Sequence, residues 1–286
     1  MRSPFARLVI GPMAAFAWGP MAAFAWGLMA ALVWGPMAMG QAGSSGGNSL
    51  YETLKDSGPG GPAPKHDVTG VWTGPLGALR GEVPPMTPLG EKRFSMNKTE
   101  RKVGWADSND PSKTCDPYGF PRSAVDEIAG IAFAQMPDKI IVLHQYNKIW
   151  REVWTDGREL PKNVDTKDGP DSTWYGYSVG HWEGDYTLVI DTTGSDKSSW
   201  LDARGYPHSV EGHYQERYTR VDHNHLELTV TVDDPKMYTR PFVLGRNKYV
   251  WVPDQKSVEQ ICVPSEAATY VNLISKPAAG KNTEGK

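Results

Sequence analysis

Glu216 is an ionisable residue whose predicted position is unusual, because it lies on the apolar face of a predicted strand. It lies in segment 212–220, where it alternates with Tyr214 and Tyr218 and shares their face of a predicted strand. A carboxylate on an apolar face loses its water, which costs several kcal/mol unless the group is paired, hydrogen-bonded or protonated. Glu216 is therefore either part of a buried pair that stabilises the fold, or a polar anchor or general acid/base in a ligand cavity.

A second group of chemically capable residues occupies the predicted loop 194–210. Asp202, Arg204 and His208 lie close together there, and binding residues often sit on loops held by a rigid scaffold. If the protein is an enzyme, His208, Asp202 and Glu216 are the candidates for moving a proton. Arg204 is a candidate ligand-binding residue. We expect this loop to form the mouth of any cavity that contains Glu216.

Arg151 is the first candidate partner for Glu216. In the predicted strand 149–155 it shares one face with Ile149 and Val153. Two tryptophans occupy the other face, so either face could be the inner one. If the aliphatic face points inward, Arg151 lies where it could pair with Glu216 or hold a ligand.

The strand that carries Glu216 is expected to form a hairpin with 226–232. This second segment alternates strictly between apolar and polar residues, and a polar loop of about five residues separates the two. With Arg220 opposite Leu226 both faces are internally consistent, which favours this register over a shift by one residue. The inner face then pairs Tyr218 with Leu228, Glu216 with Val230, and Tyr214 with Val232.

Segments 174–182 and 185–192 predict another hairpin, around Glu183-Gly184. With a two-residue turn, Ser178 shares a face with Asp191 and with two small glycine positions. That face leaves room for a packed neighbour or for a cavity, and in the second case Ser178 and Asp191 are candidate ligand-binding residues. The opposite face carries Tyr177, Val179, Leu188 and Ile190 and is typical of a core.

The remaining segments complete a mainly β protein. Strands are also predicted at 67–72, 132–135, 139–146, 237–244 and 247–252, the last two as a hairpin around Gly245-Arg246, and a helix is predicted at 87–102. Because strand segments recur between short turns, we expect one antiparallel β-barrel or strongly curved sheet of about eight to ten strands. It would have a long N-terminal loop region and at most one or two short helices.

The beginning of the chain has the pattern of a secretory signal. Arg2 and Arg7 precede a long apolar run, and small-residue cleavage sites follow near Gln41 and Gly43. The alternative is an uncleaved membrane anchor, because the run exceeds the roughly 20 residues that a span needs. We expect a signal peptide at 1–42, a flexible leader at 43–66, a single domain at 67–265, and a tail at 266–286 that is disordered from about 277. The mature protein would then be periplasmic or extracellular, without a stable membrane anchor.

Cys115 and Cys262 are the two cysteines of the chain. In an oxidising compartment an isolated pair most simply forms one disulfide. The bond would close a loop of about 147 residues, for which the chain-entropy model gives a stabilisation of somewhat under about 5 kcal/mol.

Composition and missing motifs narrow the classes of partner. The net charge of −3 and the absence of basic clusters argue against nucleic acid or an anionic membrane surface. The 11 Trp and 12 Tyr suit an aromatic or sugar-like small molecule, although such residues also pack β-sheets. The sequence contains no phosphate-binding glycine loop, no nucleophile elbow and no familiar spacing of zinc ligands, so we expect neither a cofactor nor a metal.

A set of short motifs is spread over most of the chain, from Gly70-x-Trp72 to Cys262. Between them lie Cys115-x-Pro-x-Gly-x-Pro-Arg122, Thr155-Asp-Gly-Arg158, Ser178-x-Gly-x-Trp-Glu-Gly-Asp185, Asp191-Thr192, Trp200-Leu-Asp202, Pro207-His-Ser209 and Glu216-Arg217. As a set they resemble a large family of secreted bacterial proteins of uncharacterised activity, common in acidobacteria and other soil bacteria. Gly70-x-Trp72 by itself resembles the opening of lipocalin-like or calycin-like barrels, in which the tryptophan closes one end. The resemblance implies a family but no particular reaction.

Two classes of function stay open. The first is an exported β-barrel that binds a small, partly apolar ligand in an aromatic-rich cavity through Glu216, Arg151, Tyr214 and Tyr218. The second is a cofactor-independent enzyme, a lyase, isomerase or hydrolase, in which His208 or Glu216 moves a proton. Binding ranks first because nothing in the sequence identifies a nucleophile.

Overall fold

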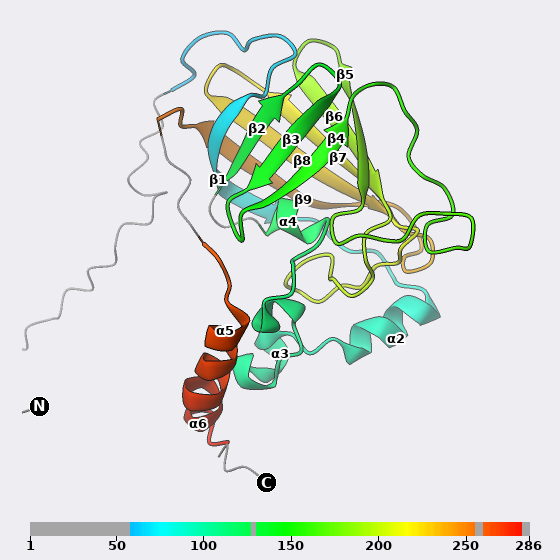
Figure 1. Cartoon of the computed structure of the whole chain (residues 1–286), viewed down its shortest axis with the longest axis vertical. Helices are drawn as coiled ribbons and strands as arrows, with labels where there is room; N and C mark the ends of the chain where they lie inside the picture. The colour runs from blue at the N-terminus through cyan, green and yellow to red at the C-terminus, as the bar shows by residue number, and fades with distance from the viewer. Residues whose placement is uncertain (1–57, 127–129, 255–259, 282–286) are drawn as a thin grey trace, which may run out of the picture. The chain divides into compact units, whose positions relative to one another are not determined.

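A computed structural model describes residues 58–126, 130–254 and 260–281. The predicted signal peptide, the leader before residue 58 and the last residues after 281 lie outside the described residues. Within the described ranges the chain forms nine β-strands that close into one barrel (Figure 1). The prediction of a mainly β, barrel-like fold is confirmed.

The elements follow one another in a simple order. The strands are β1 (Gly70–Arg80), β2 (Ile131–Gln135), β3 (Lys139–His144), β4 (Ile149–Trp154), β5 (Tyr177–Glu183), β6 (Thr187–Thr193), β7 (His213–Arg220), β8 (His225–Asp233) and β9 (Phe242–Trp251). The helices are α2 (Pro88–Met96), α3 (Glu100–Val103), α4 (Arg122–Val125), α5 (Pro264–Tyr270) and α6 (Lys276–Ala278), with the 3-10 helices η1 (Trp105–Asp107) and η2 (Pro111–Thr114) and the π-helix η3 (Val271–Ser275).

Each strand pairs with the next one along the chain, and β9 pairs with β1 to close the barrel. The neighbours are antiparallel except β4 and β5, which are parallel and pair only at Val153 with Ser178 and at Trp154 with Val179. The expectation of a wholly antiparallel sheet is therefore wrong at this junction. For β5 to run parallel to β4, the chain must cross back to the end of the barrel at which β4 begins. Residues 155–176 make this crossover outside the barrel (Figure 1).

The β7–β8 hairpin has the predicted register. Arg220 pairs with Leu226 and Glu216 with Val230. Burial alternates along both strands, and Glu216 lies on the buried face together with Tyr214 and Tyr218. The period-two pattern thus places a carboxylate in the barrel interior, as predicted.

The β5–β6 hairpin has a loop one residue longer than predicted, and its strand register differs from the prediction by three residues. Its loop contains three residues, 184–186, and begins with Gly184 in a left-handed conformation (φ 60°). Ser178 consequently pairs with Thr192, and Val179 pairs with Asp191. Because a shift by an odd number of residues moves every side chain to the other face, the predicted sharing of a face by Ser178 and Asp191 is wrong.

The predicted hairpin around Gly245-Arg246 is wrong as well, because β9 is one continuous strand. Gly245 pairs with Val230 of β8 on one side and with Arg80 of β1 on the other. A Cβ atom at Gly245 would lie 3.3 Å from the carbonyl oxygen of Leu79. The glycine therefore serves the close approach of neighbouring strands at the closure of the barrel, and not a turn.

The predicted helix 87–102 forms as two shorter helices. Thr87 caps α2, since its hydroxyl accepts a hydrogen bond from Gly90 N at 3.1 Å. The helix ends at Met96. The backbone of the next residue, Asn97, is extended, and its side chain donates to the carbonyl oxygen of Gly205 at 2.8 Å. This contact with the 194–210 loop separates α2 from α3.

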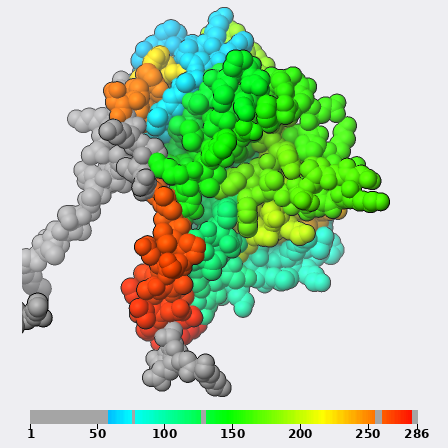
Figure 2. All heavy atoms as spheres, in the orientation of Figure 1, coloured from blue at the N-terminus to red at the C-terminus, as the bar shows by residue number. Residues whose placement is uncertain are grey.

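The segment expected to be a C-terminal tail is helical from Pro264 to Ala278. Pro264 suits a first helical turn, and the alanines that follow favour a helix. Figure 2 shows this segment in red at the surface, and α5 and η3 contact η2 and η1. None of the helices in the described ranges has both the length and the apolar character that crossing a membrane requires.

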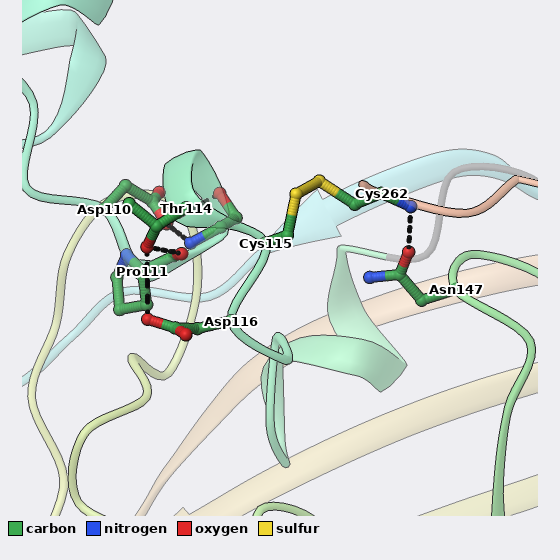
Figure 3. The surroundings of a disulfide bond; sticks show 8 residues. Asp110, Pro111, Thr114, Cys115, Asp116, Asn147 and Cys262 are labelled. Carbon is green, nitrogen blue, oxygen red and sulfur yellow. Dashed lines mark hydrogen bonds between the residues drawn. A yellow bond between two sulfur atoms is a disulfide. The ribbon is translucent and has the colours of Figure 1, made fainter. Parts of the chain in front are cut away.

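Cys115 and Cys262 form the predicted disulfide, with Cα atoms 5.4 Å apart (Figure 3). Cys115 directly follows η2, in the long connection between β1 and β2. The backbone N–H of Cys262 donates to Asn147 Oδ1 at 2.7 Å, as Figure 3 also shows. The disulfide therefore ties the C-terminal helical segment to the loops at one end of the barrel.

The described part of the expected leader, 58–66, makes contacts with barrel loops. Asn224, in the β7–β8 loop, donates to the carbonyl oxygens of Pro59 and Gly58. The N–H of His66 donates to the carbonyl oxygen of Asp185 at 2.7 Å. Ordered contacts with the barrel thus begin before Asp67.

Candidate functional site

An ion pair between Arg151 and Glu216 lies inside the barrel. Glu216 is completely buried and Arg151 is 4% exposed. Arg151 Nη2 donates to Glu216 Oε2, and the Tyr218 hydroxyl donates to Glu216 Oε1 at 2.9 Å. Arg151 is thus the partner of Glu216 that the sequence suggested, and the aliphatic face of β4 points inward.

The other contacts of Arg151 come from β5, β6 and the loop before α4. Nη1 donates to Ser178 Oγ at 3.3 Å and lies 3.5 Å from Thr192 Oγ1, and these two hydroxyls are 2.8 Å apart. The guanidinium carbon is 4.2 Å from the centre of the Phe120 ring. Such stacking favours a cation without replacing its hydrogen bonds. The charge of Arg151 is therefore enclosed by Glu216, two hydroxyls and one aromatic ring.

Tyr218 has a defined protonation state at this site. Burial, followed by the nearby Glu216, raises the pKa of Tyr218 well above its usual range. The phenol therefore stays protonated at neutral pH, and it acts as a hydrogen-bond donor to the carboxylate.

A pocket of about 760 Å³ lies beside this ion pair, at the junction of β4 and β5. The strands pair at Val153 and Trp154 only, and the segments 149–152 and 173–177 that line the pocket are not joined by such pairing. Its walls include five aromatic residues, Trp150, Trp154, Trp174, Tyr175 and Tyr177. Arg151 and Ser178 also line it, so the pocket extends to the residues that bind the buried ion pair.

The loop that carries Asp202, Arg204 and His208 does not line this pocket. Arg204 forms an ion pair with Asp202 at 2.6 Å and donates to the carbonyl oxygen of Gly81. Burial raises the pKa of Asp202, although Arg204 opposes that shift. The expected cavity mouth at this loop is therefore wrong, because the pocket opens at the β4–β5 junction instead.

His208 is fully buried and hydrogen-bonded to Ser199 and Ser209. Its Nδ1 is 3.2 Å from the carbonyl oxygen of Ser209, which requires a proton on Nδ1, and Nε2 then accepts from Ser199 Oγ at 2.9 Å. Burial lowers the pKa of His208, so the ring is neutral at neutral pH. Its ring meets the Tyr214 ring edge-on, 6.0 Å between centres, and no hydrogen bond joins it to Glu216 within the described residues.

Tyr214 and Asp191 also lie apart from the pocket lining. Tyr214 packs edge-on against Phe120, with ring centres 5.5 Å apart, and burial raises its pKa well above the usual range. Asp191 lies on the outer face of β6, 3.1 Å from His213 Nε2. The structure thus brings together Arg151, Glu216, Tyr218 and Ser178, and it places Tyr214 one ring contact away through Phe120.

Sequence reasoning missed several residues of the site. A three-residue turn at 184–186 would have placed Thr192 opposite Ser178, so the signal for Thr192 was present in the strand pattern. Trp174 and Tyr175 were placed in the predicted strand 174–182 without a role in the site, and Tyr177 was assigned to its core face. For Phe120, which reaches Arg151 from a proline-rich connection, the sequence offers no periodic signal.

Within the described ranges, no group of three or more His, Cys, Asp or Glu side chains is arranged to hold a metal ion. A comparison with models of known protein families finds none that matches the chain, and a search of curated protein sequences finds no match either.

Proposed function

We propose that this protein is an exported carrier or receptor that binds a small, partly apolar ligand in the pocket at the β4–β5 junction. The observation that carries the proposal is the pocket itself, which combines about 760 Å³ of space with five aromatic residues and a buried polar end. Small-molecule sites typically have roughly 300–1,000 Å³ and a largely apolar lining with a few fixed polar groups. The β4–β5 pocket has these properties.

The Arg151–Glu216 pair gives the polar end of the pocket a fixed geometry. Arg151 is held by Glu216, Ser178 and Phe120 at once. A side chain held from three directions loses little rotamer freedom when a ligand arrives, which favours binding. In the proposed site Arg151 is the orienting residue, and the aromatic walls supply most of the contact area.

Binding accounts for the geometry better than catalysis does. The three candidate proton-transfer groups, His208, Glu216 and Asp202, are buried, and none of them lines the pocket. A general acid or base must come within hydrogen-bond reach of the reacting group. Glu216 already accepts hydrogen bonds from Arg151 and Tyr218, so its role is to position Arg151.

Export is the second half of the proposal. The Cys115–Cys262 disulfide suits an oxidising compartment, and the N-terminal apolar run after Arg2 and Arg7 suits secretion. A carrier in the periplasm or outside the cell would meet its ligand there. The two observations are independent, since one concerns the folded domain and the other the first residues of the chain.

The test uses equilibrium dialysis with methyl 2-naphthoate, an uncharged aromatic ester, as the probe. Trp150 is 59% exposed and lines the pocket, so Trp150→Ala should leave folding intact and weaken binding at least about tenfold. Tyr186 is the matched control, because it is 40% exposed and lies in the β5–β6 loop, outside the lining. Equal affinities for wild type, Trp150→Ala and Tyr186→Ala would place the binding site elsewhere and overturn the proposal.

A further inference from the structure

The charged side chains that line the β4–β5 pocket are each matched by an opposite charge. The lining contains two cations and two anions, Arg151, Arg158, Glu152 and Glu159. Arg151 pairs with Glu216, and Arg158 pairs with Asp156 at 2.6 Å. Glu152 pairs with Lys139 at 2.8 Å, and Glu159 pairs with Lys162 at 3.1 Å. The pocket wall is therefore electrically balanced.

Two of the paired cations, Lys139 and Arg158, also contact the ring of Trp154 in the pocket wall. Lys139 Nζ lies 4.5 Å from the centre of the Trp154 ring, and Arg158 Cζ lies 3.5 Å from it. A charged ligand would have to break an existing pair or leave its own charge unmatched against aromatic walls, and both are unfavourable. The balance of charge thus disfavours both anions and cations.

The Nε–H group of Arg151 is a hydrogen-bond donor without an acceptor in the described part of the protein. The Nη atoms of Arg151 are bonded to Glu216 and Ser178, while its Nε is buried and has no hydrogen-bond partner within the described ranges. Buried donors without an acceptor are rare in folded proteins. Since β4 and β5 pair at only two positions beside this side chain, an acceptor that enters between the strands would complete the hydrogen bonds of Arg151.

We infer that the pocket takes an uncharged, ring-containing ligand whose carbonyl, ether or hydroxyl oxygen accepts a hydrogen bond from Arg151 Nε. This inference depends on the proposed binding function and narrows it to one chemical class. The ring stacks on the aromatic wall, and the acceptor oxygen reaches the inner end of the pocket. Charge balance disfavours a carboxylate or an ammonium group as the recognised feature.

Three probes of nearly the same shape separate the parts of the inference. Methyl 2-naphthoate has the ring and an uncharged acceptor, sodium 2-naphthoate has the ring and a negative charge, and 2-ethylnaphthalene has the ring alone. In equilibrium dialysis the ester should bind at least about tenfold more tightly than each of the others. Tighter binding of the naphthoate would overturn the preference for an uncharged ligand and leave the pocket in place. Equal binding of the ester and 2-ethylnaphthalene would overturn the role of Arg151 Nε, and no binding of any probe would contradict the proposed function itself.

A direct observation of Arg151 in the wild-type protein, supported by one variant, completes the test. In a ¹H–¹⁵N spectrum of the wild-type protein, the Nε–H signal of Arg151 is recognisable by its contact with the Phe120 ring, 4.2 Å from the guanidinium carbon. Addition of methyl 2-naphthoate should shift this signal downfield, and 2-ethylnaphthalene should not. Arg151→Lys keeps a cation opposite Glu216 but removes Nε, so a folded Arg151→Lys protein should bind the two uncharged probes equally. An unchanged Nε–H signal under saturating ester would contradict the inference.

Discussion

The hydroxyl oxygen of Ser178 accepts a hydrogen bond from Arg151 Nη1 at 3.3 Å, across the parallel junction between β4 and β5. The same guanidinium binds Glu216 on β7. Only two residue pairs join the backbones of β4 and β5, so these side-chain bonds supply a connection that the backbone ladder does not. These side-chain bonds therefore join the strands where the ladder is shortest, and the ion pair also forms the inner end of the pocket.

Glu216→Gln should destabilise the protein by about 3–5 kcal/mol, because it leaves the buried cation of Arg151 without its partner. The Tyr218 hydroxyl can still donate to the amide oxygen, so the loss comes mainly from the broken charge pair. Urea unfolding followed by tryptophan fluorescence measures the change. The double variant Arg151→Met/Glu216→Leu removes both charges and should recover most of that stability while losing affinity for methyl 2-naphthoate. A Glu216→Gln protein as stable as wild type would show that the pair contributes nothing to the fold.

The alternation of apolar and polar residues explains why the β7–β8 hairpin could be predicted. A shift by one residue would move Leu228 and Val230 to the face opposite Tyr218, and the barrel adopts the register without that shift. The same reasoning placed Glu216 inside and identified Arg151 as its partner, because both alternate with apolar residues. The strict period-two patterns of these strands thus allowed the Arg151–Glu216 pair to be predicted from the sequence.

Three features escaped prediction, each for a physical reason. The parallel junction depends on the course of residues 155–176, which contain no helix to mark a crossover. The β5–β6 register depends on whether the loop has two or three residues, and Gly184 suits either. The position of the pocket depends on the parallel junction and on the β5–β6 register. Because neither was predicted correctly, the mouth of the cavity was predicted at the 202–208 loop instead.

Removal of the disulfide should destabilise the protein. Because the bond closes a loop of 147 residues, Cys115→Ser/Cys262→Ser should lower the free energy of unfolding by up to about 4–5 kcal/mol. Thiol labelling of the unfolded, unreduced wild-type protein should find no free thiol. Two reactive thiols per chain would show that the bond does not form.

His213 and Asp191 should make stability depend on pH. Their hydrogen bond raises the pKa of His213 above 6.5 and lowers the pKa of Asp191 below 3.8. The pair is therefore fully stabilising from about pH 4 to 6.5; its contribution is lost as the pH rises through the folded pKa of His213, or falls through that of Asp191. Because His213 is about half exposed, the contribution should stay below about 1 kcal/mol.

His213→Gln should accordingly lower stability near pH 5.5 and leave it unchanged near pH 9, as measured by urea unfolding at both values. His208 is an internal control in an NMR titration, since burial lowers its pKa and its midpoint should lie below 6.5. A His213 midpoint at or below that of His208 would contradict the assignment of the Asp191 pair.

A crystal structure of the protein grown with methyl 2-naphthoate tests the central claim most directly. We predict density for the naphthalene ring against Trp150 and Tyr177 in the β4–β5 pocket, with an ester oxygen within hydrogen-bond distance of Arg151 Nε. Density for the ester at another surface of the barrel, with the β4–β5 pocket holding only water, would contradict it.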